Sequence, residues 1–135
     1  MDRQTDPTQI DPVPDSFIAR PSVPQLELLQ QIDLFITHGG MNSVNEGLYY
    51  GVPLAVAPQH IEQALNGRQA TKLGAGVVIG NAPPFGRVNA KELRTVVETV
   101  LADNGYRQNA THIGHSFREA GGYQQTADVI EAVLR

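Results

Sequence analysis

The stretch that decides the fold is IDLFITHGGMNSVNEGLYYGVPLAVAP, residues 32–58. Residues 32–38 and 52–58 are short, nearly continuous apolar runs of strand length, which is typical of parallel strands buried on both faces. The segment between Gly40 and Gly51 suits a helix, and Gly51 fits the position that follows a helix C-terminus. Strand, helix and strand in this order predict two parallel strands joined by a helical crossover.

The alternation continues beyond this stretch. Toward the C-terminus the pattern predicts helices over 62–73, 89–102, 105–119 and 123–134, a strand over 76–80 and a turn at 104–105. Parallel strands that alternate with helices predict a doubly wound α/β layer structure. A sheet of roughly three or four strands is thin for this architecture, so the sequence reads as part of a domain.

The N-terminal segment is less regular. Residues 1–16 are rich in proline and aspartate and are interpreted as an irregular lead-in. Residues 17–25 begin as a short β segment that Pro21 and Pro24 prevent from continuing, because proline cannot donate to a ladder. Residues 25–31 fit one or two helical turns.

Composition places the chain among ordinary globular proteins. Its 135 residues suffice for one compact domain, with 41% hydrophobic and 18% charged residues. A net charge of −4 with only 10 lysines and arginines argues against a nucleic-acid partner. The lack of cysteine excludes disulfides and thiolate metal sites. No apolar run is long enough to cross a bilayer and the N-terminus is unlike a signal peptide, so we expect a cytoplasmic protein without a membrane span.

The turn after the first predicted strand is the main candidate site. Ligands of open parallel sheets bind outside the carboxyl ends of the strands, and His38 lies at such an end. The glycines allow close approach of a ligand to the backbone, and the helix that follows offers unpaired N–H groups and a partial positive charge. Asn42 and Ser43 add side-chain donors in its first turn. Together these groups could hold a diphosphate.

Glu46 extends this candidate site by one helical turn. It lies on the same face as Asn42 and Ser43, so its carboxylate projects beside them and could accept hydrogen bonds from the vicinal hydroxyls of a ribose. The residues alone leave a purely structural strand-to-helix turn about equally plausible. Neither GxGxxG nor a P-loop lysine is present. A Ser–His hydrolase is disfavoured because Ser43 lacks the GxSxG elbow.

The motifs become specific when they are taken together. VPQLELL, DLFITHGGMNSVNEGLYYGVPLAVAPQ and the following EQ contain, in order, P-Q, H-x-G, N-S, E, G-V-P, P and an acid–Gln pair. This series resembles the donor-binding signature of UDP-dependent glycosyltransferases, most closely the bacterial macrolide-type branch. The resemblance covers roughly residues 12–80. It implies the C-terminal half of a two-domain GT-B fold, with residues 17–135 forming an incomplete Rossmann-like parallel sheet flanked by helices, a partial nucleotide-sugar binding domain.

The resemblance also assigns roles to particular positions. It implies that the donor is a UDP-sugar, with UDP-glucose expected, and that no cofactor or metal takes part. The implied contacts are His38, Gly40, Asn42 and Ser43 to the diphosphate, Ser22, Val23, Gln25 and Glu46 to the uracil and ribose, and Glu62 and Gln63 to the sugar. The family usually has Trp or Phe at the position of Ser22, where the ring stacks on uracil. The residues alone allow Glu62 and Gln63 a capping role instead.

The resemblance places the general base outside this sequence. In the family that base is a histidine near the start of the N-terminal domain, which also binds the acceptor. His38 is therefore interpreted as stabilising the leaving diphosphate, and no catalytic base is expected in this chain. The sequence starts partway into the donor domain by this comparison, so we expect the chain to be inactive alone.

Three hypotheses follow for a chain of this kind. It is a partial or truncated glycosyltransferase, a subunit completed by a separate acceptor-binding chain, or a degenerate remnant whose turn is only structural. An incomplete sheet leaves an edge and an apolar face open, so we expect self-association or a partner.

Overall fold

The computed structural model describes residues 12–135, and most of the predicted lead-in over 1–16 lies outside them. The elements follow in the order α1 (Gln25–Leu29), β1 (Phe35–Thr37), α2 (Met41–Tyr49), β2 (Leu54–Val56), α3 (Ile61–Lys72), β3 (Gly76–Val78), α4 (Ala90–Ala102), α5 (Asn104–Glu119) and α6 (Gly122–Leu134). The predicted alternation of strands and helices is confirmed, with each strand shorter than expected.

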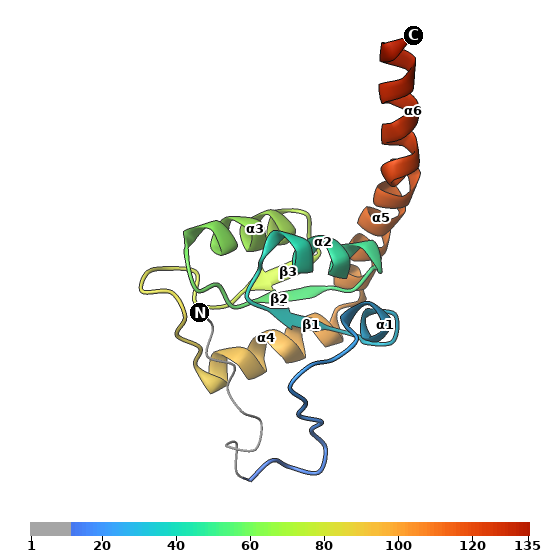
Figure 1. The fold of residues 1–135 in the computed structure, drawn as a ribbon. Helices are drawn as coiled ribbons and strands as arrows, with labels where there is room; N and C mark the ends of the chain where they lie inside the picture. The colour runs from blue at the N-terminus through green and yellow to red at the C-terminus, as the bar shows by residue number, and fades with distance from the viewer. Residues whose placement is uncertain (1–11) are drawn as a thin grey trace.

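In the described part of the chain the sheet has three strands in the order β1–β2–β3, and both pairings are parallel. Phe35 pairs with Leu54, and Leu54 pairs with Gly76 on the other side. Figure 1 shows α2 and α3 on one face of the sheet and α4 on the other. The predicted fold class, a parallel sheet flanked by helices, is confirmed. All three strands therefore end at the same edge, where the predicted site lies.

The core is split by the central strand. Leu54 and Val56 point to the face covered by α2 and α3, whereas Ala55 points to the face covered by α4, as the two-residue period of a strand requires. All three side chains are fully buried. Burial of a side chain such as Leu54 contributes about 1.5–3 kcal/mol. This burial on both faces explains why the strand reads as a continuous apolar run.

The predicted β segment over 17–25 is wrong. The described residues before α1 contain no strand, and Phe17 and Ile18 are exposed. A strand needs a neighbour to pair with, and Pro21 and Pro24 remove two of the donors that pairing would use.

The predicted turn at 104–105 is also wrong. Asn104 and Gly105 form the first turn of α5 instead. Asp103 caps this helix, because its Oδ1 accepts a hydrogen bond of 2.8 Å from the Gly105 N–H. A carboxylate cap one residue earlier therefore outweighs the turn preference of the Asn-Gly pair.

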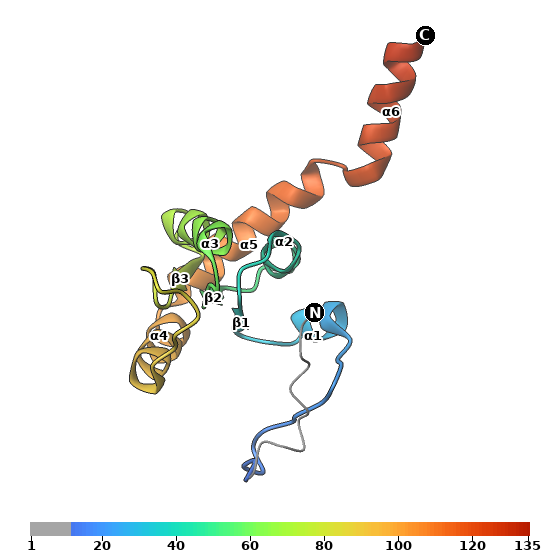
Figure 2. The same cartoon turned by 60° about the vertical axis from the view of Figure 1, so that its left-hand side comes forward.

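The last two helices lead away from the sheet. α5 packs closely on the C-terminal end of α2, since a Cβ at Gly114 would lie 2.7 Å from the carbonyl oxygens of Leu48 and Tyr49. Gly121 and Gly122 then adopt positive φ angles of 79° and 54°, and α6 leaves the body of the molecule (Figure 2). No α6 residue is buried. Within residues 12–135, no helix has the length and apolarity that a bilayer crossing requires.

Candidate functional site at the end of the first strand

The turn after β1 is shaped by Gly39. Its φ of +91° lies in the left-handed region that favours glycine. The space around it is also closed, because a Cβ there would lie 2.6 Å from Cγ1 of Val56 and 2.9 Å from the backbone oxygen of Gln63. The turn is therefore pressed between β2 and the first turn of α3. A residue with a side chain does not fit at Gly39.

Two hydrogen bonds hold the backbone of this turn. The Gly39 N–H donates to Oγ1 of Thr37 over 3.3 Å. The Gly39 carbonyl accepts from Nδ2 of Asn66 over 2.9 Å, and Asn66 belongs to α3. Both polar groups of Gly39 are thus satisfied by the protein, so neither is free for a ligand.

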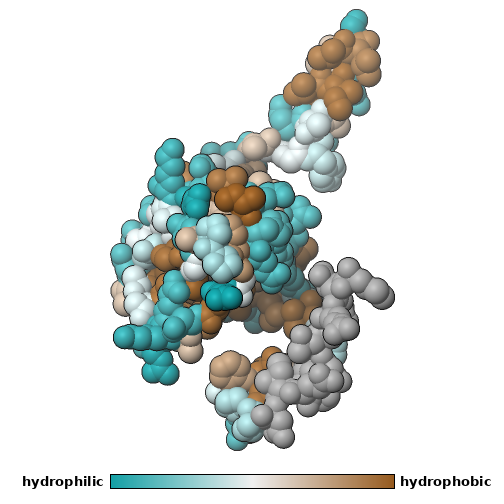
Figure 3. All heavy atoms as spheres, turned by 90° about the vertical axis from the view of Figure 1, so that its left-hand side faces the viewer, coloured by the Kyte–Doolittle hydropathy of each residue, from teal (hydrophilic) through white to brown (hydrophobic). Residues whose placement is uncertain are grey.

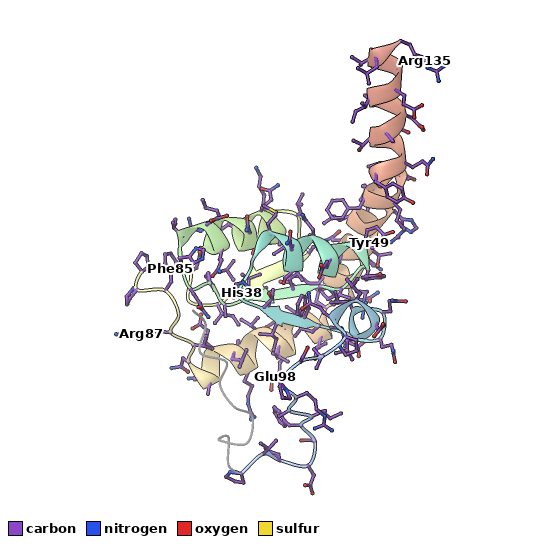
Figure 4. The ribbon with its side chains drawn as sticks, in the orientation of Figure 1. His38, Tyr49, Phe85, Arg87, Glu98 and Arg135 are labelled. Atoms are coloured by element: carbon purple, nitrogen blue, oxygen red, sulfur yellow. The ribbon has the colours of Figure 1, made fainter. Side chains whose placement is uncertain are left out.

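His38 lies beside the turn rather than inside it. Its side chain is exposed, and its Nε2 approaches within 2.9 Å of the place that a Cβ on Gly40 would occupy. The imidazole therefore lies next to Gly40 at the carboxyl end of β1, where it is accessible from solvent (Figure 4). A side chain at Gly40 would displace the ring.

The N-terminus of α2 begins at the same point. Gly40 is the N-cap residue and provides no side-chain cap, and the first intrahelical bond runs from the Val44 N–H to the Gly40 carbonyl. The N–H groups of residues 41–43 therefore have no partner within the helix. Asn42 is exposed and Ser43 is half-buried. They occupy the second and third positions of α2, in its first turn as the sequence predicts.

Glu46 lies further along α2 and faces α1. Its Oε2 accepts a hydrogen bond of 2.5 Å from Nε2 of Gln25, and both side chains are half-buried. The structure thus brings together two of the residues expected at the ribose. The remaining two residues of that set, Ser22 and Val23, are exposed in the segment that enters α1. Their backbone groups take part in none of the hydrogen bonds found among residues 12–135.

The two residues expected at the sugar face different surroundings. Glu62 is exposed in the first turn of α3. Gln63 is only 9% exposed, and its Oε1 accepts a hydrogen bond of 2.8 Å from the Gln59 N–H. Gln63 therefore fixes the loop between β2 and α3, which leaves its NH₂ group as the part able to meet a ligand.

A cavity adjoins the nucleoside end of this set. It has a volume of about 390 Å³, lies between α1, α2 and α5, and is lined mainly by aromatic and aliphatic side chains: Leu26, Asn45, Glu46, Tyr49, Tyr50 and Phe117. It does not reach the turn at Gly39, so it is separate from the expected diphosphate position.

Sequence reasoning missed Thr37, Asn66 and the aromatic side chains of this cavity. Asn66 contacts a residue 27 positions away, and no local pattern signals such a contact. Thr37 carries a weak signal, because a hydroxyl at the last position of a buried apolar run needs a partner.

Comparison with known proteins finds a family and individual proteins that this chain resembles in sequence. The chain matches the family described as erythromycin biosynthesis protein CIII-like, C-terminal domain, over residues 1–129. It is 40% identical over 127 residues to an uncharacterized UDP-glucosyltransferase, YojK, of Bacillus subtilis, with 93% of this chain and 30% of that protein covered. It is 39% identical over 130 residues to the NDP-glycosyltransferase YjiC of the same species, with 96% and 32% covered.

A solved structure agrees with these matches. The glycotransferase of kitacinnamycin superposes with a TM-score of 0.84 at 33% identity, with 96% of this chain and 33% of that one covered. The chain thus spans about a third of the length of the relatives it matches.

Proposed function

Because the chain belongs to the family of erythromycin biosynthesis protein CIII-like C-terminal domains, we propose that residues 17–135 bind the nucleotide-sugar donor of a UDP-sugar glycosyltransferase. The reaction transfers the sugar to a hydroxyl group of a small acceptor molecule with inversion at the anomeric carbon. The acceptor oxygen forms the new bond, the bond to the diphosphate breaks, and UDP leaves with the electron pair. The acceptor's proton goes to a base outside these 135 residues.

One observation carries the proposal: the exposed imidazole of His38 and the uncapped N-terminus of α2 meet at the carboxyl end of β1. The unpaired N–H groups and helix dipole favour an anion there by about 0.3–1 kcal/mol, and hydrogen bonds to a charged group add about 1.5–3 kcal/mol each. Asn42 and Ser43 stand in the first turn as further donors. A diphosphate gains charge as it leaves, so these groups stabilise the transition state more than the bound donor.

The nucleoside end follows from the second half of α2. Glu46 offers a carboxylate that already accepts one hydrogen bond from Gln25, and it has further lone pairs for ribose hydroxyls. The backbone N–H and C=O of Val23 have no hydrogen-bond partner among residues 12–135, and they are proposed to meet the hydrogen-bonding edge of the uracil. Ser22 offers no ring for the base to stack on, and the missing stack lowers affinity by about 1–3 kcal/mol.

The sugar end is proposed at the start of α3. Glu62 presents an exposed carboxylate, and the NH₂ group of Gln63 is not used in the hydrogen bond that fixes the loop. Together they suit adjacent hydroxyls of a hexose, and UDP-glucose is the donor we propose.

The partner is proposed to be an acceptor-binding domain, on the same polypeptide or on a separate chain. Two surfaces support a partner. Within residues 12–135, β1 pairs with β2 alone, and its Ile36 is 48% exposed. The second is α6, where hydrophobic side chains gather in Figure 3. Its exposed large apolar side chains are Tyr123, Val129, Ile130, Val133 and Leu134. Without the partner, these surfaces favour self-association.

Titration of the chain with UDP tests the proposal. We expect shifts of the backbone amide signals of residues 38–46 in ¹⁵N–¹H spectra at up to millimolar UDP. Glu46→Ala should weaken UDP binding by about 10- to 100-fold, the effect of lost hydrogen bonds between charged groups and hydroxyls. Glu62 is an exposed carboxylate on another helix, α3. Glu62→Ala should change the affinity for UDP less than twofold and should weaken the binding of UDP-glucose. No shifts at millimolar UDP would refute the donor site, and the reverse order of the two variants would refute the assigned ends.

A further inference from the structure

The peptide between Gly39 and Gly40 joins two residues without side chains, and a hydrogen bond from Asn66 helps to fix its orientation. The orientation of this peptide decides whether its N–H group can point toward a bound anion. A trans peptide directs its C=O and its N–H to opposite sides, so the direction of the Gly39 carbonyl decides where the Gly40 N–H points. The Gly40 N–H itself has no hydrogen-bond partner among residues 12–135.

Asn66 fixes this orientation from α3. Its Nδ2 donates to the Gly39 carbonyl over 2.9 Å across 27 residues of sequence, and its side chain is half-buried between α2 and α3. The carbonyl is therefore drawn toward α3, and the Gly40 N–H is turned away from α3. The Gly39 N–H is held separately by Oγ1 of Thr37. The hydrogen bond from Asn66 thus sets the orientation of the Gly39–Gly40 peptide, which precedes α2.

We propose that Asn66 is a positioning residue for diphosphate recognition: it holds the Gly39–Gly40 peptide so that the Gly40 N–H points with the first N–H groups of α2 toward the phosphate oxygens. This inference rests on the proposed function, because it concerns the same site. Asn66 does not touch the ligand. Its effect reaches only the phosphates, since the nucleoside end is held by α1 and the middle of α2 through Gln25 and Glu46.

The test compares two ligands that differ only in the phosphates. The Kd of UDP and of uridine is measured by NMR titration for the unmodified chain, Asn66→Ala and Asn66→Asp. A carboxylate has the shape of the amide but cannot donate to the Gly39 carbonyl. Gln69→Ala is the matched control, because Gln69 is an exposed polar residue of α3 that lines the same α2–α3 gap without bonding the turn.

Asn66→Ala should raise the Kd of UDP about three- to tenfold, the effect of one hydrogen bond, and that of uridine less than twofold. Asn66→Asp should raise the Kd of UDP at least as much, because its charge also repels phosphate. The shift of the Gly40 amide on UDP addition should shrink in both variants and persist in Gln69→Ala.

The possible outcomes distinguish the role of Asn66 from the proposed binding of the donor. UDP binding that both Asn66 variants leave unchanged would overturn this inference alone. Equal losses for UDP and uridine would overturn it as well, because a general loosening of the fold affects both ligands. If Asn66→Ala does not fold, Asn66→Asp decides, since it preserves volume. Failure of the unmodified chain to bind either ligand would overturn the proposed function and this inference with it.

Discussion

Gly39→Ala is expected to be among the most destabilising single-methyl additions in the turn region. The methyl group would require a positive φ of +91° from an L residue, which costs about 1–2 kcal/mol. It would also lie 2.6 Å from Cγ1 of Val56 and 2.9 Å from the backbone oxygen of Gln63. One of these contacts is with backbone, so α3 or β2 must move, at about 1–3 kcal/mol. The sum is a loss of about 2–5 kcal/mol in the free energy of unfolding.

Gly86→Ala is the matched control for this prediction. Gly86 has a φ of +85°, close to that of Gly39, but a Cβ there meets nothing within 4 Å. It should lose only the strain contribution of about 1–2 kcal/mol. The difference between the two variants therefore measures how tightly β2 and α3 enclose the turn.

Urea unfolding followed by circular dichroism measures both variants. The midpoint of Gly39→Ala should fall by about 1 M or more, at an unchanged slope, and clearly more than that of Gly86→Ala. Equal midpoints would show that β2 and α3 accommodate a methyl group at Gly39 without loss of stability, which would refute the close packing of this turn.

Two further predictions concern the periphery of the fold. Arg107 donates hydrogen bonds to the carbonyls of Gly51 and Ile32 and to the carboxylate of Asp33. Arg107→Met should therefore lower the free energy of unfolding by about 1–3 kcal/mol. Asp33→Asn should lower it by less than about 1 kcal/mol, because the Asp33 side chain is 86% exposed. Thermal denaturation compares them, and a larger effect of Asp33→Asn would contradict the assignment of the stabilisation to the carbonyls. Deletion of residues 121–135 should leave the unfolding midpoint unchanged and reduce self-association in analytical ultracentrifugation, because α6 buries no residue; a lower midpoint would show that α6 supports the fold.

Sequence reasoning succeeded where one local pattern determines the outcome. The strand around Leu54 is buried on both faces, so its residues are all apolar and the strand could be identified from them alone. The spacing of Asn42 and Glu46 also fixes their shared helix face. The order of these elements along the chain therefore predicted the fold class, and it placed the candidate site at the carboxyl edge of the sheet.

The failures have a common physical origin. The segment containing Pro21 was expected to begin as a strand, although strand formation depends on a neighbour that local sequence does not reveal. The Asn104–Gly105 pair has turn propensity, but a cap from Asp103 prevails. Asn66 joins the turn through a contact 27 residues away. Each miss concerns a partner distant along the chain or a competition that only the folded structure decides.

The parallel sheet also determines when the proposed donor site can form during folding. Among the described residues every strand pairs only with a neighbour that arrives after a complete helix, so no local hairpin can form first. The turn at Gly39 acquires its contacts with Val56 and Asn66 only once β2 and α3 have both docked. A nucleotide that binds there binds the native state and not the unfolded chain. At a hundred times its Kd it would stabilise the chain by about 2.7 kcal/mol, so a nucleotide-dependent rise in melting temperature reports donor binding without any acceptor or turnover.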